Sequence, residues 1–149
     1  MLNFDSKIQQ IEEALSFNKT FQAPDQQEIF KRALENIEDS KKKLLPDGTW
    51  HLDSHLFLDD KGITSLEGLN VSIVEGIFNV DNNKLTSLKG GPKEVGWTFN
   101  CSYNNLESLD GCPEKVGQNF RCINNKRKFT KDEVIERCEM ERGNYAIFV

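Results

Sequence analysis

The sequence lacks long apolar runs and a strong excess of charge of either sign. No stretch approaches the roughly 18 apolar residues of a membrane-spanning helix, and residues 1–7 lack the apolar region of a secretory signal peptide. The formal net charge is −5 over 149 residues, and no segment is strongly basic. A nucleic-acid backbone would require such a basic footprint. We therefore expect neither a membrane nor a nucleic acid as a partner.

Motifs that carry chemistry are also lacking. The sequence contains no glycine-rich phosphate loop, no nucleophile elbow and no paired-carboxylate motif. His51, Asp53 and His55 would share one face of an extended strand, but no other histidine or cysteine is placed to complete a closed zinc site. Cys112 as a nucleophile would need a histidine partner, and both histidines lie far from it in the sequence. We expect no catalytic residues, no metal and no cofactor.

The four cysteines lack the C-x-x-C spacing of zinc and redox sites. Cys101 and Cys122 occupy a position that Val80 fills one repeat earlier, so they are expected to act as small buried apolar residues. Cys138 falls on the apolar stripe of an expected helix. Cys112 lies in an expected turn, where we predict an exposed and reactive thiol. Four reduced thiols indicate a reducing, cytoplasmic compartment.

The dominant feature of the sequence is a repeat unit of 21 residues. Residues 74–94 align with residues 95–115 without a gap, and the pattern restarts at residues 116–125. A fixed period of this length is typical of a solenoid, in which each unit buries its apolar side against its neighbours. A first unit, one residue longer, precedes these three. The units predict parallel strands near residues 56–58, 78–80, 99–101 and 120–122.

One asparagine recurs in the same register of three units, as Asn83, Asn104 and Asn125. The chain leaves each strand sharply, which would leave backbone polar groups unpaired inside the solenoid. An inward asparagine offers two donors and an acceptor to these groups. We therefore predict a structural ladder of asparagines, and the alternative is an asparagine-rich ligand site.

The N-terminal part of the sequence is predicted to cap the solenoid. Residues 1–49 are charged and show two stretches of helical periodicity. The first contains Ile8, Ile11, Ala14 and Leu15. The second contains Ile29, Phe30, Ala33, Leu34 and Ile37, and the three lysines at residues 41–43 would form its last turn. The predicted solenoid of about four turns then spans residues 50–130.

The C-terminal part is predicted to form a second cap over residues 131–149. Thr130 and Glu133 have the spacing of a capping box at a helix start. Gly143 is expected to end that helix, and residues 145–149 to return as a strand parallel to residues 120–122. The fold class is therefore predicted to be α+β: a short parallel β solenoid with a helical N-terminal cap and a helix–strand C-terminal cap.

The repeat resembles two groups of known proteins. Residues 52–130 resemble leucine-rich repeats of the short bacterial type, with Phe99 and Cys101 at leucine positions, Asn104 at the signature asparagine and Leu106 at the next leucine; Arg127 replaces that leucine in the last unit. The segments at residues 85–102 and 129–134 resemble small phage-encoded repeat proteins. These resemblances imply a leucine-rich-repeat-like solenoid and a viral origin, and hence the host cytoplasm, but no defined activity.

Residues that alternate with the inward positions are expected to face outward from the sheet. Mixed apolar and polar side chains on a rigid surface suit protein recognition. The sequence therefore predicts a non-enzymatic protein-binding module, and the phage resemblance adds a host protein that it would bind and inhibit. The alternatives are a self-associating structural or accessory protein, which would form a homo-oligomer, and lastly an enzyme. The expected partner-binding residues are Phe57, Ile77, Asn79, Asn100 and Arg121.

Overall fold

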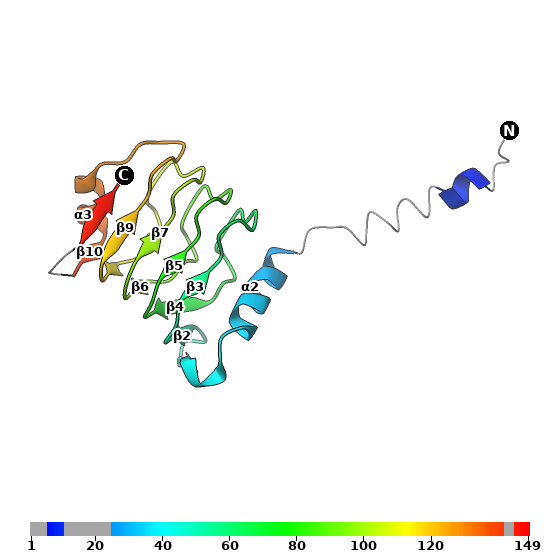
Figure 1. The fold of residues 1–149 in the computed structure, drawn as a ribbon, viewed down its shortest axis with the longest axis horizontal. Coiled ribbons are helices and arrows are strands. Elements are labelled where there is room, and N and C mark those ends of the chain that lie inside the picture. The colour runs from blue at the N-terminus through cyan, green and yellow to red at the C-terminus, as the bar shows by residue number, and fades with distance from the viewer. Residues whose placement is uncertain (1–5, 11–24, 142–144) are drawn as a thin grey trace.

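The computed structural model describes residues 6–10, 25–141 and 145–149. Its main body is a parallel β solenoid in which successive turns of chain stack side by side (Figure 1). The helix α2 (Gln26–Glu35) lies at one end of the stack, and α3 (Lys131–Arg137) lies at the other. Residues 6–10 are helical, and the rest of the first predicted amphipathic stretch lies outside the described residues.

Within the described chain, the strands form two sheets, and one of them is the sheet that the repeat predicts. This five-stranded sheet has the order β11-β9-β7-β5-β3, and every neighbouring pair is parallel. The C-terminal strand joins beside the last repeat strand, as predicted. The members are β3 (Leu56–Phe57), β5 (Phe78–Asn79), β7 (Phe99–Asn100), β9 (Asn119–Arg121) and β11 (Ala146–Phe148).

The other sheet has six strands, and the sequence did not predict it. Its order is β1-β2-β4-β6-β8-β10, with all pairs parallel except β1 with β2. Val74, Val95 and Val116 align in its register and are fully buried. The sequence marks these valines as core, but most strands around them are too short to show an alternating pattern. The members are β1 (Lys42–Leu44), β2 (Trp50–Leu52), β4 (Val71–Val74), β6 (Glu94–Val95), β8 (Lys115–Val116) and β10 (Glu139–Met140).

The core between the two sheets is built from identical positions of successive turns. Phe78, Phe99 and Phe120 pair in register along the five-stranded sheet and are fully buried. The first two rings are stacked with centroids 5.7 Å apart, and the last two meet edge to face at 5.2 Å. Both are favourable aromatic geometries. Each turn therefore buries its aromatic side chain only by stacking on its neighbours.

Asn104 ties the central turn to the turn before it. Its Nδ2 donates to the Val80 carbonyl of the preceding turn at 2.9 Å. Within its own turn, it donates to the carbonyls of Cys101 at 3.2 Å and Ser102 at 3.1 Å. Its Oδ1 accepts from the backbone N–H of Leu85, again in the preceding turn, at 2.9 Å. One side chain thus bonds to four backbone groups beyond the ends of the short strands; one of them, the Ser102 carbonyl, also accepts from the N–H of Asn82 at 3.1 Å.

The same arrangement recurs one turn earlier and one turn later. Asn83 Oδ1 accepts from the N–H of Ile63 at 2.9 Å, and its Nδ2 donates to the Leu58 carbonyl at 2.8 Å. Asn125 Oδ1 accepts from the N–H of Leu106 at 3.2 Å. Asn83 and Asn104 are buried, and Asn125, in the last turn, is half-buried. The three side chains therefore form a continuous hydrogen-bonded ladder.

The helix α2 closes the N-terminal end of the solenoid. Phe30 and Ile37, within and just after the helix, are buried in the core. Gln26 Oε1 accepts from the backbone N–H groups of Thr64 at 3.1 Å and Ser65 at 3.2 Å, in the loop of the first turn. The helix thus contributes both apolar burial and hydrogen bonds to a loop that has no preceding turn.

The lysines at residues 41–43 do not form the last turn of this helix, contrary to the sequence-based prediction. The helix ends at Glu35, and Lys42 begins β1, which pairs antiparallel with β2 through the turn at residues 45–49. The pairing with β2 offers this segment backbone hydrogen bonds that compete with a longer helix. Lys42 Nζ still reaches the helix C-terminus, where it donates to the Leu34 carbonyl at 3.0 Å, the position at which a cation suits the helix dipole.

The C-terminal end is closed by α3 and by one strand on each sheet. Thr130 and Glu133 form the predicted capping box at the start of α3, and Arg127 pairs with Glu133. Val134 is fully buried. The helix ends at Arg137, well before Gly143, which lies outside the described residues. Cys138, in extended conformation, then leads into β10 rather than continuing the helix.

The four cysteines are free thiols. Cys101 and Cys122 are buried, as their repeat positions predict, and Cys138 is buried too, although it lies just beyond the helix and not on its apolar stripe. Cys112 is not the exposed thiol that its turn position predicts, because it packs half-buried against the core. Burial raises the pKa of the Cys112 thiol to about 11, and that of Cys138 to about 12. Burial, and next to it the neighbouring Cys122 thiol, also raises the pKa of Cys101 well above its ordinary value.

The asparagine ladder predicts a stability effect. Asn104→Ala is expected to lower the free energy of unfolding by about 1–3 kcal/mol, because it leaves buried backbone groups unpaired. Urea denaturation followed by circular dichroism measures this change. Asn105→Ala is the matched control, since Asn105 is exposed and its loss should change stability by no more than about 0.5 kcal/mol. Equal stabilities of the two variants would contradict the ladder.

The thiol environment predicts a pH dependence of alkylation. With a pKa of about 11, only about one Cys112 in a thousand is a thiolate at pH 8, and the thiolate is the reactive form. Iodoacetamide should therefore label Cys112 slowly at pH 8, about tenfold faster per pH unit up to pH 10, and before the three buried cysteines. Mass spectrometry of the native protein measures each rate. Rapid labelling at pH 8, at a rate that does not rise with pH, would contradict the burial of Cys112.

Candidate functional site

Four of the five predicted partner-binding residues lie in one row across the five-stranded sheet. Phe57, Asn79, Asn100 and Arg121 are successive cross-strand neighbours in the register of β3, β5, β7 and β9. Phe57 is apolar and 54% exposed. The row continues to Phe148 of β11, because Phe148 pairs with Arg121. The sequence predicted the position of β11 but did not include Phe148 in the binding surface.

The two asparagines of this row are partly engaged within the fold. Asn79 Oδ1 accepts from the N–H of Asp81 at 3.4 Å, and Asn100 Oδ1 accepts from the N–H of Ser102 at 3.2 Å. Each side chain thus bonds to backbone just beyond its own strand, where the sheet ladder has ended. These bonds at the strand ends therefore explain why asparagine occurs at both positions, and no contact with a binding partner is needed to explain it.

Arg121 and Phe148 form the other end of the row. The guanidinium carbon of Arg121 lies 4.8 Å from the centroid of the Phe148 ring, which is the geometry of a cation–π contact. The ring restricts the long arginine side chain without neutralising it. Arg121 therefore offers an exposed, oriented cation on the outer face of the sheet.

Beside Phe57, a cluster of aromatic rings covers the bend between the two sheets. We call this bend the corner; it comprises residues 53–55, 75–77, 96–98 and 117–118 of the four turns. The His55 ring lies 5.8 Å from that of Phe57 and 5.3 Å from that of Trp97. Trp97 is 50% exposed. Ile77, the fifth predicted residue, is partly buried in the corner.

A hydrogen bond fixes the orientation and tautomer of His55. Its Nδ1 accepts from the backbone N–H of Ile77 at 2.9 Å. A backbone N–H can only donate, so Nδ1 is unprotonated in this bond and the ring proton resides on Nε2. The imidazole therefore presents a donor toward solvent between the two aromatic rings.

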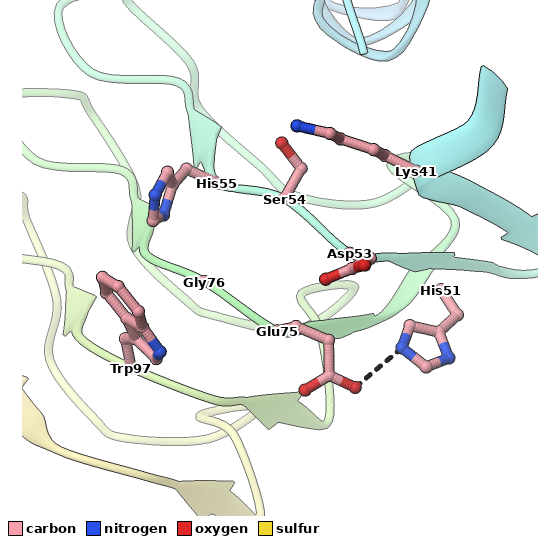
Figure 2. A pocket seen from close by; sticks show the side chains of 8 residues that line it. All are labelled: Lys41, His51, Asp53, Ser54, His55, Glu75, Gly76 and Trp97. Carbon is pink, nitrogen blue, oxygen red and sulfur yellow. Dashed lines mark hydrogen bonds and ion pairs between the residues drawn. The ribbon is translucent and has the colours of Figure 1, made fainter. Parts of the chain in front are cut away.

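The corner of the first turns contains an open recess of about 690 Å³. Figure 2 shows Trp97 and His55 at one end of it and His51, Asp53 and Glu75 toward the other. The acidic residues come from the corners of the first two turns, whereas the third and fourth turns carry glycines at the equivalent positions. The lining residues are Lys41, His51, Asp53, Ser54, His55, Glu75, Gly76 and Trp97.

The recess has an acidic character with one internal pairing. His51 Nε2 lies 2.7 Å from Glu75 Oε1, shown by the dashed line in Figure 2. Asp53 and Glu75 face one lysine, Lys41, so the lining carries a net formal charge of −1 when both histidines are neutral. In the part of the chain that the structure describes, no group of three or more histidine, cysteine or acidic side chains is arranged to hold a metal ion.

Sequence reasoning missed Trp97 and Glu75 as members of the site. Trp97 aligns with Gly76 and Gln118 in the neighbouring units, so its position varies in size from glycine to tryptophan. This variation was the available signal, because stacking does not dictate the residue at a position that tolerates such different side chains. The direction of the corner bend, which brings Trp97 against His55, was not encoded in the repeat.

Comparisons place no known protein beside this chain: no family model, no curated protein and no solved structure matches it. Among the helices of the described residues, none is long and apolar enough to cross a membrane.

The corner predicts a steric requirement for glycine. A Cβ at Gly96 would overlap the backbone carbonyl of Glu75 in the preceding turn. Gly96→Ala is therefore expected to destabilise the protein by about 1–3 kcal/mol through overpacking, as measured by urea denaturation. Gln118→Ala, at an exposed position of the next corner, is the control and should be near neutral. A Gly96→Ala variant as stable as the control would contradict the close stacking at the corner.

Proposed function

We propose that this protein is a non-enzymatic binding module that recognises another protein through its five-stranded sheet and the adjoining corner. The observation that carries the proposal is a continuous band of exposed aromatic side chains on a rigid framework. Along this band, the His55 ring contacts those of both Phe57 and Trp97. We call this band, together with Ile77, Arg121 and the acidic recess, the recognition surface.

The composition of the recognition surface supports protein binding. Tryptophan and arginine are among the residue types that dominate the binding energy of protein interfaces, and aromatic side chains are enriched there. Ring contacts already restrict His55, Phe57 and Trp97, and the Phe148 ring restricts Arg121. Their ordering on binding therefore costs less conformational entropy than that of isolated surface side chains.

The charges of the surface specify the chemistry of the partner. The recess offers the Trp97 ring at one end and the carboxylates of Asp53 and Glu75 toward the other, groups that suit a lysine or arginine side chain. Arg121, at the other end of the row, suits a carboxylate. Between these ends, Phe57 and the partly buried Ile77 offer apolar contact. The partner we propose is a protein with an apolar contact region flanked by one basic and one acidic side chain.

The setting of this interaction rests on the thiols and on the resemblance to phage proteins. Four free cysteines, three of them buried, support a reducing compartment such as the cytoplasm. The resemblance to small phage-encoded repeat proteins supports a bacterial host protein as the target and inhibition as the consequence. The recognition surface supports a protein as the partner, whereas the proposal of a host protein rests on that resemblance alone.

The proposal predicts that two substitutions on the recognition surface abolish capture of the partner. The tagged full chain and its Phe57→Ala/Arg121→Glu variant are used to capture proteins from a lysate of the cells in which the protein is made. Mass spectrometry quantifies each captured protein. A specific partner should fall by tenfold or more in the variant, since each substitution removes a residue of the kind that contributes about 2 kcal/mol or more to binding.

A matched control changes an equivalent pair of residues on another face. Ile135, on α3, is 52% exposed, close to the value for Phe57, and Lys131 is exposed on the same helix. The Ile135→Ala/Lys131→Glu variant should capture the partner as the unmodified protein does. Equal capture by all three proteins would contradict the recognition surface. Capture of the chain itself as the main species would favour the self-association alternative.

A further inference from the structure

The two sheets of the solenoid have four outer edges, and the edges differ in how they are protected. An unprotected edge presents unpaired backbone groups to any other strand, and proteins block such edges with charge, short length or a covering element. The six-stranded sheet ends in β1, which contains Lys42 and Lys43, and in β10, which contains Glu139 and precedes Glu141. Two copies meeting at either edge would bring like charges together.

The edges of the five-stranded sheet carry no such charges within their strands. At one edge, β3 is two residues long, and Ala33 of α2 and the segment just after the helix line a recess together with Leu56 and Phe57. At the other edge, β11 lies in the segment Tyr145-Ala-Ile-Phe-Val149, which contains no charged residue. Tyr145 and Phe148 are each 42% exposed. The helix α3 lies against β11 at this end of the stack, so its lack of charged side chains, and not exposure of the whole strand, sets this edge apart.

The backbone of β11 is oriented for pairing on its free side. The Phe148 carbonyl accepts from the N–H of Cys122 at 2.8 Å, so the polar groups of Phe148 face β9. Backbone groups of successive residues in a strand point to opposite sides. Those of Ile147, and likewise of Tyr145 and Val149, therefore point away from β9. Within the described residues, no strand pairs with this side of β11.

We propose that β11 pairs antiparallel with β11 of a second copy of this chain, in a register centred on Ile147. In this register, Ile147 meets Ile147 of the second copy, and Tyr145 meets Val149, so all the outward backbone groups face outward groups of the other strand. Ala146 lies opposite Phe148 on the outer face, a small side chain against a large one. The two five-stranded sheets then join into one continuous sheet.

Self-pairing is favoured over pairing with an unrelated peptide because the segment is complementary to itself. Its hydrogen-bonding pattern is symmetric about Ile147, and it has no charged side chains that would repel those of a second copy. A two-fold contact of this kind uses the same edge on both copies and closes the assembly at two. It needs no other molecule, so its failure would leave the proposed recognition of a partner protein untouched.

The register can be tested with substitutions on the outer face of β11. The unmodified full chain should sediment as a dimer at high concentration in analytical ultracentrifugation. In the proposed pair, residue 146 of one copy lies opposite residue 148 of the other. The Ala146→Lys/Phe148→Lys variant places lysine against lysine and should be monomeric. The Ala146→Lys/Phe148→Glu variant places opposite charges together and should dimerise.

Three results would overturn the proposal: a monomeric unmodified protein at all concentrations, a dimeric Lys/Lys variant, or a monomeric Lys/Glu variant that retains the native circular dichroism spectrum. Amide hydrogen exchange on the unmodified protein gives a test that does not depend on any variant folding. The Ile147 amide should exchange about tenfold or more slowly in the dimer than at high dilution. The Phe148 amide, which faces β9 within one copy, should be protected equally in both. An Ile147 amide whose exchange is independent of concentration would also overturn the pairing.

Discussion

The solenoid depends on hydrogen bonds that asparagine side chains make between successive turns. Most strands between the two caps are only two or three residues long, so the sheet ladders alone leave several backbone groups of each turn unpaired inside the protein. Asn104 satisfies carbonyls of its own turn and both a carbonyl and an N–H of the turn before. Such a side chain sets the turns in register, because it bonds only where both sets of groups are within reach. The in-register outer row from Phe57 to Arg121 is a consequence of this constraint.

The features that the sequence predicted are those that repetition or a local rule dictates. The five-stranded sheet follows from the identical spacing of Phe78, Phe99 and Phe120, since equivalent positions of stacked turns must pair. The start of α3 follows from the capping box of Thr130 and Glu133, a rule contained within four residues. By contrast, the six-stranded sheet is made entirely of two- to four-residue strands and is defined by backbone pairing between turns. A single buried valine per turn, such as Val95, does not reveal that pairing.

The candidate site was predictable in its outer row and not in its corner. Phe57 and Arg121 alternate with buried residues, so their exposure follows from strand geometry. Trp97 and Glu75 belong to the corner, where the chain bends between the sheets and side-chain direction depends on the bend itself. Their meeting with His55 and His51 joins two or three turns at non-equivalent positions, and a repeat pattern relates only equivalent ones. The prediction that the lysines at residues 41–43 end the helix was wrong for a related reason. The strand β2 offers this segment backbone hydrogen bonds, and helix periodicity does not take such a partner into account.

The ends of the solenoid differ in how the core and the sheet edges are covered. A solenoid of about four turns has only a few internal sheet contacts for each exposed end, so the caps contribute a large part of its burial. The strand β11 completes the core with Ile147, which is 7% exposed, yet it turns the backbone of the same residue outward. The strand β11 therefore covers the core at this end of the solenoid but leaves the outer edge of its sheet without a pairing strand. The recognition surface is made of side chains that vary between turns. The outer edge of the five-stranded sheet is instead made of backbone groups of β11, which continues the parallel pairing of the repeat strands.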